Sequence, residues 1–153
     1  AGKLDQKDYK VYAILGDGEI QEGQIWEAAM SAAHFKLDNL VAILDNNNLQ
    51  ISGSVDKVMS PYPIDEKFAA FGFEVLHIDG NDMNQIEEAI HKARTIKGKP
   101  TLILAKTVKG KGVSFMENNY KWHGSAPNKE QYEQAVGELD AQIARLEKEV
   151  AAQ

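Results

Sequence analysis

Apolar residues follow two kinds of pattern along the chain, short continuous runs and helical spacing. Short runs bounded by Gly, Asn, Asp or Pro are typical of strands, whereas apolar positions three and four apart are typical of amphipathic helices. The runs predict strands at residues 12–15, 40–44, 73–78 and 101–107. The helical spacing predicts helices at residues 21–36, 64–71, 83–97 and 128–153. Alternating strands and helices predict an α/β fold, a parallel sheet with helices on both faces.

Several predicted helices carry recognisable end signals. Gly72 is placed to close the second helix, and Asn81 or Asp82 can cap the third. Asn128, with Gln131 three positions later, is close to a capping box at the start of the last helix.

The first helix has an apolar stripe that we expect to pack on the sheet. The stripe comprises Ile25, Trp26, Ala29, Met30 and Ala33. His34 lies near this face, and we interpret it as a packed core residue. Glu22 falls in the expected first turn, where the helix dipole favours an anion.

The last helix carries an a/d seam of about three heptads. The seam comprises Tyr132, Val136, Leu139, Ile143, Leu146 and Val150. Two interpretations are open, a helix packed along its own domain, which we favour, and a helix that binds a partner helix. We therefore divide the chain into an α/β domain over residues 1–127 and a helix over residues 128–153, packed on that domain or extending from it.

The turns after the first two strands carry the first candidate chemistry. Gly16-Asp17-Gly18 follows the first strand, and Asp45-Asn46-Asn47-Asn48 follows the second, with Asn47 30 positions after Asp17. Parallel strands bring these turns to one edge of the sheet, where open α/β sheets bind ligands. A carboxylate oxygen suits Mg²⁺ or Ca²⁺, and a helix N-terminus favours an anion. The pattern predicts a site for a metal-bound phosphate or diphosphate.

A second candidate region follows the fourth strand, at the same predicted edge. Residues 109–112, Lys-Gly-Lys-Gly, form a flexible basic stretch, and we weigh solvated loop charge and ligand binding equally for its lysines. Further on, His123 lies between Trp122 and Gly124. A histidine there suits proton transfer or a hydrogen bond to phosphate, although a loop histidine alone is seldom catalytic.

These motifs together resemble a known family. A GDG turn, a helix and an asparagine turn at this spacing resemble the thiamine diphosphate-binding motif. The stretch GDGEIQEGQIWEAAMSAAHFKLDNLVAILDNNNLQISG is similar to the N-terminal half of transketolase, and KTVKGKGVSFMENNYKWHG matches the same family in order and spacing. The resemblance covers nearly the whole chain and implies the diphosphate-binding (PP-type) domain of that enzyme.

The resemblance also implies roles for particular residues. Mg²⁺, for which Ca²⁺ or Mn²⁺ can substitute, is held by the side chains of Asp17 and Asn47 and by the backbone carbonyl of Leu49. His123 touches the diphosphate and the sugar oxygens and is the catalytic candidate. Glu22 belongs to a carboxylate cluster at a subunit interface. The implied cofactor contacts are Gly16, Asp17, Gly18, Glu19, Asn47, Ile51 and His123.

The asparagine turn departs from the family at one position. The family often has glycine where this chain has Asn48, and asparagine tolerates the left-handed region that glycine would occupy. The triple asparagine leaves the register open by one residue, and we prefer Asn47 to Asn46 as the metal ligand.

By resemblance, the activity is transfer of a two-carbon ketol unit between sugar phosphates. The family's domain begins well upstream of Ala1, so we expect an N-terminally truncated domain, with residues 1–10 as the end of a helix and a polar turn. The ring-binding domain, with the glutamate that activates the aminopyrimidine, is expected elsewhere on the same or a separate chain, in a homodimer or heterotetramer. Alternatives are deoxyxylulose-phosphate synthase, a dehydrogenase E1 subunit, and a non-catalytic cofactor-binding or scaffolding piece.

Composition narrows the remaining function classes. The 153 residues have a formal net charge of −6 and no cysteine, which excludes a disulfide framework and a thiolate metal site. Without a basic block we expect no nucleic-acid partner, and no apolar run approaches the roughly 20 residues of a membrane span. We expect a cytoplasmic protein that contacts no membrane.

Overall fold

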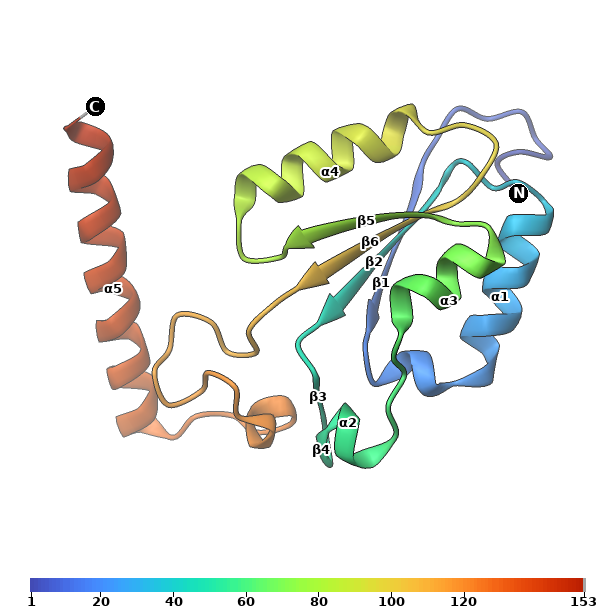
Figure 1. The fold of residues 1–153 in the computed structure, drawn as a ribbon. Coiled ribbons are helices and arrows are strands. Elements are labelled where there is room, and N and C mark those ends of the chain that lie inside the picture. Colours follow the sequence, from blue (N-terminus) through green and yellow to red (C-terminus); the bar gives the residue numbers. More distant parts are fainter. Residues whose placement is uncertain (153) are drawn as a thin grey trace.

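A four-stranded parallel sheet forms the centre of the computed structural model, which describes residues 1–152. The strand order is β1-β2-β6-β5, and all three neighbouring pairs are parallel (Figure 1). The strands are β1 (Val11–Gly16), β2 (Leu40–Asn46), β5 (Glu74–Asp79) and β6 (Thr101–Lys106). The predicted strands and their parallel arrangement are confirmed. Their carboxyl ends therefore meet at one edge of the sheet.

Helices cover both faces of this sheet, as expected. Helices α1 (Gly23–His34) and α3 (Ile64–Phe71) lie on one side and α4 (Met83–Thr95) on the other (Figure 1). Alternation along β2 separates the two cores, because Leu44 packs in the α1–α3 cluster and Val41 in the α4 cluster. The alternation of a single strand thus fixes the two layers.

The predicted helix-end signals are confirmed. Gly72 ends α3 in the left-handed region with φ 101°, and the Asp82 carboxylate accepts backbone N–H bonds from the first turn of α4. Asn128 and Gln131 form a complete capping box at the start of α5 (Lys129–Ala151).

The region before α1 differs from the prediction. A short 3₁₀ helix, η1 (Glu19–Gln21), precedes α1, and Glu22 lies between them in an extended conformation with no side-chain capping bond. Glu22 is therefore the residue before the helix rather than part of its first turn. Likewise, residues 2–6 form turns rather than the end of a helix.

The buried face of α1 is narrower than expected. Ala29 and Ala32 are buried, but Met30 is 61% exposed and His34 is exposed, so the expectation of burial is wrong for these two residues. Each residue turns a helix by about 100°, and Met30 falls outside the narrow stripe that Ala29 places against the sheet.

A short hairpin follows β2 that the sequence pattern did not indicate. It pairs β3 (Leu49–Gln50) with β4 (Gly53–Ser54), and α2 (Val55–Val58) follows directly. The hairpin lies beyond the carboxyl end of β2, below the sheet in Figure 1.

The segment after β6 folds on itself rather than forming a flexible basic stretch. The Asn118 amide donates to the Lys109 carbonyl at 3.0 Å, and Trp122 Nε1 donates to the Phe115 carbonyl at 3.1 Å. Gly110 has φ 72°, and a side chain there would meet the Met116 carbonyl at 2.6 Å. These contacts hold η2 (Tyr120–His123) in place.

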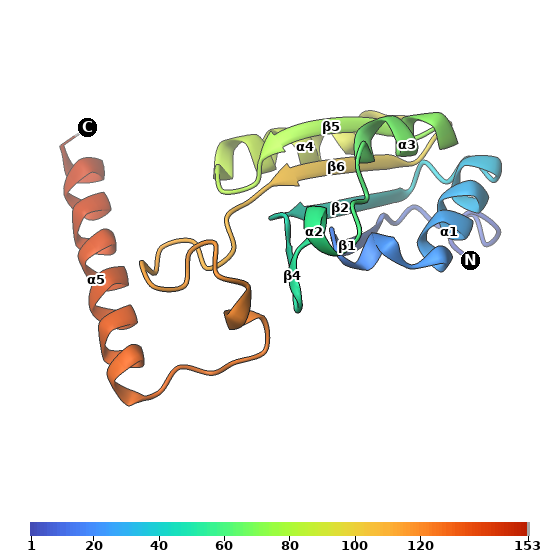
Figure 2. The same cartoon turned by 60° about the horizontal axis from the view of Figure 1, so that its bottom comes forward.

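Helix α5 extends away from the sheet instead of packing along it, as Figures 1 and 2 both show. Most of its predicted seam is exposed, and Ala135 is its buried residue among those described. The interpretation that the seam packs on its own domain is therefore not met.

Among residues 1–152, every helix is too short or too polar to cross a bilayer.

Candidate functional site

The candidate site forms where β1 and β2 end. The Asp17 amide donates to the Asp45 carbonyl at 3.2 Å, and the Asn48 amide donates to Asp17 Oδ2. The Asp17 side chain is only 1% exposed. The structure thus brings together the GDG turn and the asparagine turn, as the parallel arrangement of β1 and β2 predicts.

The Asp17 carboxyl lies in an electrostatic environment that favours a bound cation. The pKa of Asp17 is raised to about 6, chiefly because the carboxyl is buried, with the Asn48 amide lowering it and the nearby Asp45 carboxylate adding to the rise. A buried carboxylate beside a second one is unfavourable when ionised. A divalent cation would remove that cost, so the electrostatics fit a metal.

We expect Mg²⁺ affinity to rise as the pH increases through about 6, because the metal must displace the proton of Asp17. Without metal, the contribution of Asp17 to folding stability changes with pH in the opposite direction. The folded protein binds this proton more tightly than the unfolded chain, so the contribution of Asp17 is present below pH 3.8 and is lost as the pH rises to about 6. Thermal unfolding of wild type and Asp17→Asn between pH 4 and 7, with and without Mg²⁺, isolates this group. A difference between them that does not change with pH would contradict the assignment.

The asparagine turn supplies further oxygen atoms. Asn47 Oδ1 accepts from the Leu49 amide at 2.9 Å, and Asn48 has φ 62°, which confirms the expected left-handed conformation. Asn48 Oδ1 is buried and, among the described residues, has no hydrogen-bond partner. A buried carbonyl oxygen needs a donor or a cation, so this atom also fits a bound metal or metal-bound water.

Close packing explains the second glycine of the GDG turn. A β-carbon on Gly18 would lie 2.9 Å from Gln50 Cβ. Gln50 in turn accepts from Gln21 Nε2 at 2.6 Å, and Gln21 also donates to the Met59 carbonyl at 2.7 Å. Gly18 therefore lets the turn and the hairpin pack directly together.

Gly18→Ala should displace the hairpin that carries Leu49, the predicted source of a carbonyl ligand, and should lower Mg²⁺-dependent cofactor affinity about tenfold or more, since a misplaced ligand weakens metal binding. Gly23→Ala is the matched control, because a β-carbon on Gly23 has no neighbour within 4 Å. Calorimetry on both variants measures the effect. Equal affinity in the two variants would show that the packing contact is dispensable.

Two side chains near the site, Tyr62 and Thr107, were not indicated by the sequence pattern. Tyr62 Oη donates to Asn46 Oδ1 at 2.6 Å, and the Thr107 hydroxyl donates to Asp45 Oδ1. Tyr62 comes from the loop before α3, and Thr107 directly follows β6, so only the folded chain brings them here. Asp45 itself lies in the predicted turn, and its side chain is held through Thr107.

The His123 segment lies beside the hairpin. η2 contacts β3, and Lys109 Nζ lies 3.4 Å from His123 Nδ1. His123 is exposed, and Ile51, in the turn of the hairpin, is 70% exposed. The structure therefore brings the His123 segment to the same edge as the Leu49 segment and leaves both side chains accessible.

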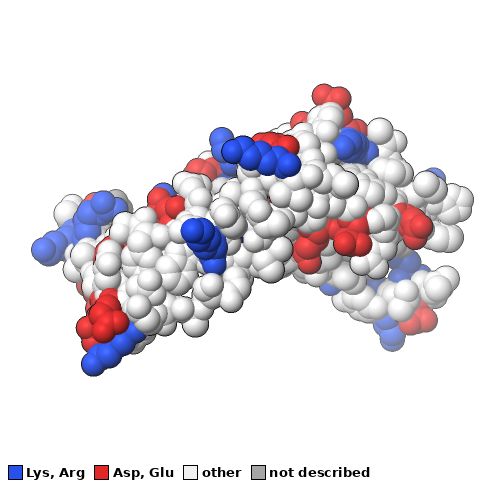
Figure 3. Space-filling view, turned by 90° about the horizontal axis from the view of Figure 1, so that it is seen from below, with Lys and Arg blue, Asp and Glu red and all other residues white. Residues whose placement is uncertain are grey.

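Basic charge on this side of the molecule is dispersed. In Figure 3, which views the molecule from below, Lys and Arg side chains lie scattered over a largely uncharged surface, and a group of Asp and Glu side chains lies right of its centre. Within residues 1–152, no group of three or more His, Cys, Asp or Glu side chains is placed to hold a metal. The predicted site, with one carboxylate, one amide oxygen and one backbone carbonyl, does not need such a group of three side chains.

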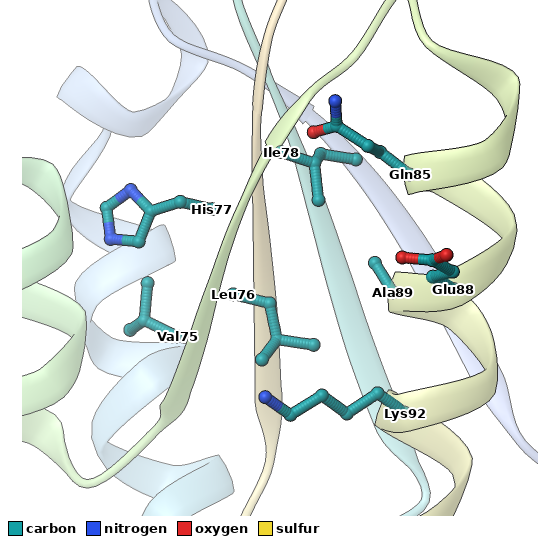
Figure 4. A pocket seen from close by; sticks show the side chains of 8 residues that line it. All are labelled: Val75, Leu76, His77, Ile78, Gln85, Glu88, Ala89 and Lys92. Carbon is teal, nitrogen blue, oxygen red and sulfur yellow. The ribbon is translucent and has the colours of Figure 1, made fainter.

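A separate hollow lies between β5 and α4, away from the strand ends. Figure 4 shows Leu76 and Ile78 of β5 facing Gln85, Glu88 and Lys92 of α4. This hollow borders β5, an edge strand of the sheet, and shares no residue with the candidate site.

Comparison with known proteins identifies the family. Residues 2–147 match the family model described as transketolase, thiamine diphosphate binding domain. The chain belongs to this family. The thiamine diphosphate-binding fold inferred from the GDG and asparagine turns is thereby confirmed.

Curated relatives include single subunits of transketolases. The chain is 48% identical over 149 residues to an apulose-4-phosphate transketolase subunit of Phocaeicola vulgatus, and the match covers 97% of this chain and 53% of that protein. It is 41% identical over 144 residues to the 6-deoxy-6-sulfo-D-fructose transketolase subunit SqwG of a Clostridium species, covering 94% and 52%. The chain thus spans about half the length of these relatives.

Solved transketolases share the fold. The Campylobacter jejuni enzyme superposes with a TM-score of 0.83 at 38% identity, covering 89% of this chain and 21% of that one. The Pichia stipitis enzyme in complex with sedoheptulose 7-phosphate gives a TM-score of 0.81 at 27% identity, covering 92% and 21%. This chain is thus a transketolase-like thiamine diphosphate-binding unit.

Proposed function

We propose that this chain supplies the metal- and diphosphate-binding half of a transketolase that transfers a two-carbon ketol unit between sugar phosphates. One observation carries the proposal. The buried Asp17 carboxyl meets the asparagine turn at the carboxyl edge of a parallel sheet, and that turn holds Asn48 Oδ1, which has no hydrogen-bond partner within residues 1–152. In a thiamine diphosphate-binding domain, these groups suit a Mg²⁺-bound diphosphate.

The proposed metal ligands are the Asp17 carboxylate, the Asn47 amide oxygen and the Leu49 carbonyl. Their donor types are the hard oxygens that Mg²⁺ prefers. Asp17 contributes the charge, and the two neutral oxygens complete its side of the coordination. The hydrogen bond from the Asn48 backbone amide to Asp17 fixes the carboxylate relative to the turn that carries Asn47 and Leu49.

The remaining residues hold the cofactor and substrate. Gly16 and Gly18 let the backbone approach the diphosphate, and Glu19 fixes the turn by accepting from the Gly16 amide at 2.6 Å. Ile51 offers an apolar surface, and His123 hydrogen-bonds the diphosphate and moves a proton at the sugar oxygens. The exposed Glu22 is available for a subunit interface. When bound, thiamine diphosphate supplies the carbanion-stabilising chemistry.

The ring-binding domain, with its activating glutamate, is proposed to lie outside residues 1–153, on the same or a separate polypeptide. The names of two relatives denote transketolase subunits, which supports separate chains. The working assembly is then a homodimer or a heterotetramer.

Titration of thiamine diphosphate with Mg²⁺ and with EDTA tests the binding part of the proposal. Product analysis tests the reaction, with xylulose 5-phosphate, apulose 4-phosphate and 6-deoxy-6-sulfo-D-fructose as alternative ketol donors, the latter two because two relatives bear those names. Metal-dependent binding together with ketol transfer supports the proposal. Binding without transfer to any acceptor would favour another thiamine diphosphate enzyme, and absence of binding would favour a scaffold.

A further inference from the structure

Helix α5 presents an apolar seam that the described residues leave open. Figures 1 and 2 show the helix standing apart from the sheet. Five large side chains of the seam are between 41% and 71% exposed, namely Tyr132, Leu139, Ile143, Leu146 and Val150. The 23-residue helix is about 34 Å long at about 1.5 Å per residue. A contiguous apolar surface of this kind marks a place where another protein binds.

The hydrogen bonds of α5 with its own domain use a different stripe of the helix, although Leu139 of the seam also lies beside Gly112. Glu138 accepts from the Ser114 amide and hydroxyl, each at 2.6 Å, and Gln142 Nε2 donates to the Gly112 carbonyl at 2.7 Å. At about 100° per residue, these positions lie about a quarter turn from the centre of the seam. The domain therefore anchors the helix and leaves the seam facing outward.

The charges beside the seam argue against a second copy as the occupant. Glu133, Asp140 and Glu147 recur every seven residues along one flank, where Glu133 pairs with Lys129 at 3.9 Å, and Glu149 lies on the other flank. Arg145 is the basic residue nearest the flank that carries Glu149, and it already pairs with Glu149 at 3.6 Å. Two copies packed through the seam would place acidic flanks against each other, whereas a partner with Lys and Arg flanks would gain.

The anchor of α5 also places the seam near the candidate site. Ser114 belongs to the loop that ends in η2, and the Asn128 cap lies five positions after His123. A partner seated on α5 would therefore border the segment that carries His123.

We propose that the α5 seam docks onto the polypeptide that supplies the ring-binding half of the enzyme, on an apolar surface flanked by Lys and Arg. This inference rests on the proposed function. It assigns the exposed helix a task that the cofactor site does not need, which is to hold the second polypeptide beside the His123 loop.

The test measures the Kd between the full chain and the separately purified ring-binding polypeptide of the same organism, by sedimentation or interferometry. Ile143→Asp with Leu146→Asp should raise the Kd at least about 100-fold, because each residue is a central apolar anchor.

Asp140→Lys with Glu147→Lys should raise the Kd about tenfold at low salt and less at high salt. Ala141→Asp with Ala144→Asp, which adds the same two charges to the same helix away from the seam, should stay within about twofold. Circular dichroism verifies the helix in each variant.

Three results would overturn the docking proposal. They are a wild-type chain that forms no complex, a seam variant that binds as tightly as wild type, and a self-dimer of the chain that the seam substitutions abolish. Failure of the proposed function is seen separately, as a wild-type complex that assembles through α5 and binds no thiamine diphosphate.

Discussion

Replacement of Asp17 by Asn should abolish Mg²⁺-dependent binding of thiamine diphosphate in the assembled enzyme. Asp17 is the charged member of the proposed ligand set, and its carboxylate is fixed in place by the Asn48 amide. Loss of an outer-shell partner of a metal costs about 10–100-fold in affinity, so loss of a charged ligand should cost at least the upper end of that range. Calorimetry with Mg²⁺ in excess measures the change.

Asp38→Asn is the matched control for this experiment. Asp38 lies before β2, at the opposite end of the sheet, where it accepts from Lys3 Nζ and from the Gly98 amide at 2.9 Å each. The same chemical change there should leave cofactor affinity unaltered. Undiminished affinity in Asp17→Asn, or an equal loss in both variants, would remove Asp17 from the metal site.

The asparagine register is tested in the same assay. Asn47→Ala should weaken binding less than Asp17→Asn, because a neutral oxygen is lost rather than a charge. Asn46 has a structural partner in Tyr62, and its replacement should act mainly on the loop before α3. If Asn46→Ala abolishes binding and Asn47→Ala does not, the ligand lies one position earlier.

Replacement of His123 by Ala should reduce turnover about 10²–10⁴-fold, as expected for a group that moves or orients a proton, with a smaller change in cofactor affinity. His123 is exposed on η2 beside the hairpin, so its loss should leave the fold intact. Steady-state kinetics of the assembled enzyme measures turnover, and calorimetry measures affinity.

His91→Ala is the control for the His123 experiment. His91 lies exposed on α4, with Glu87 3.7 Å away, on the face of the sheet opposite α1 and α3. Its replacement should change neither turnover nor affinity. Wild-type turnover in His123→Ala would make His123 a bystander.

The features predicted from the sequence are those that local chemistry determines. Gly72, Asp82 and Asn128 each act within a few residues of their own position, and the structure confirms all three. The meeting of Asp17 with the asparagine turn was also predictable, because it follows from the topology of two parallel strands.

Features that depend on distant neighbours could not be predicted in the same way. The 3₁₀ turn before α1 adjoins Gly18, which packs against Gln50 on a hairpin that no local signal marks. That the side-chain oxygen of Asn48 has no hydrogen-bond partner in the described part of the chain is known only once the surrounding residues are in place. The spacing on α5 identified an apolar seam, but a seam does not specify what covers it, and the structure leaves it exposed.

A reconstitution assay tests the central claim most directly. Ketol transfer from xylulose 5-phosphate to ribose 5-phosphate is measured with Mg²⁺ and thiamine diphosphate, first with the 153-residue chain alone and then with the proposed ring-binding domain added. The account predicts no transfer from the chain alone and transfer after the addition, with activity lost in Asp17→Asn. Transfer by the pure chain, with no co-purifying protein by mass spectrometry, would contradict it.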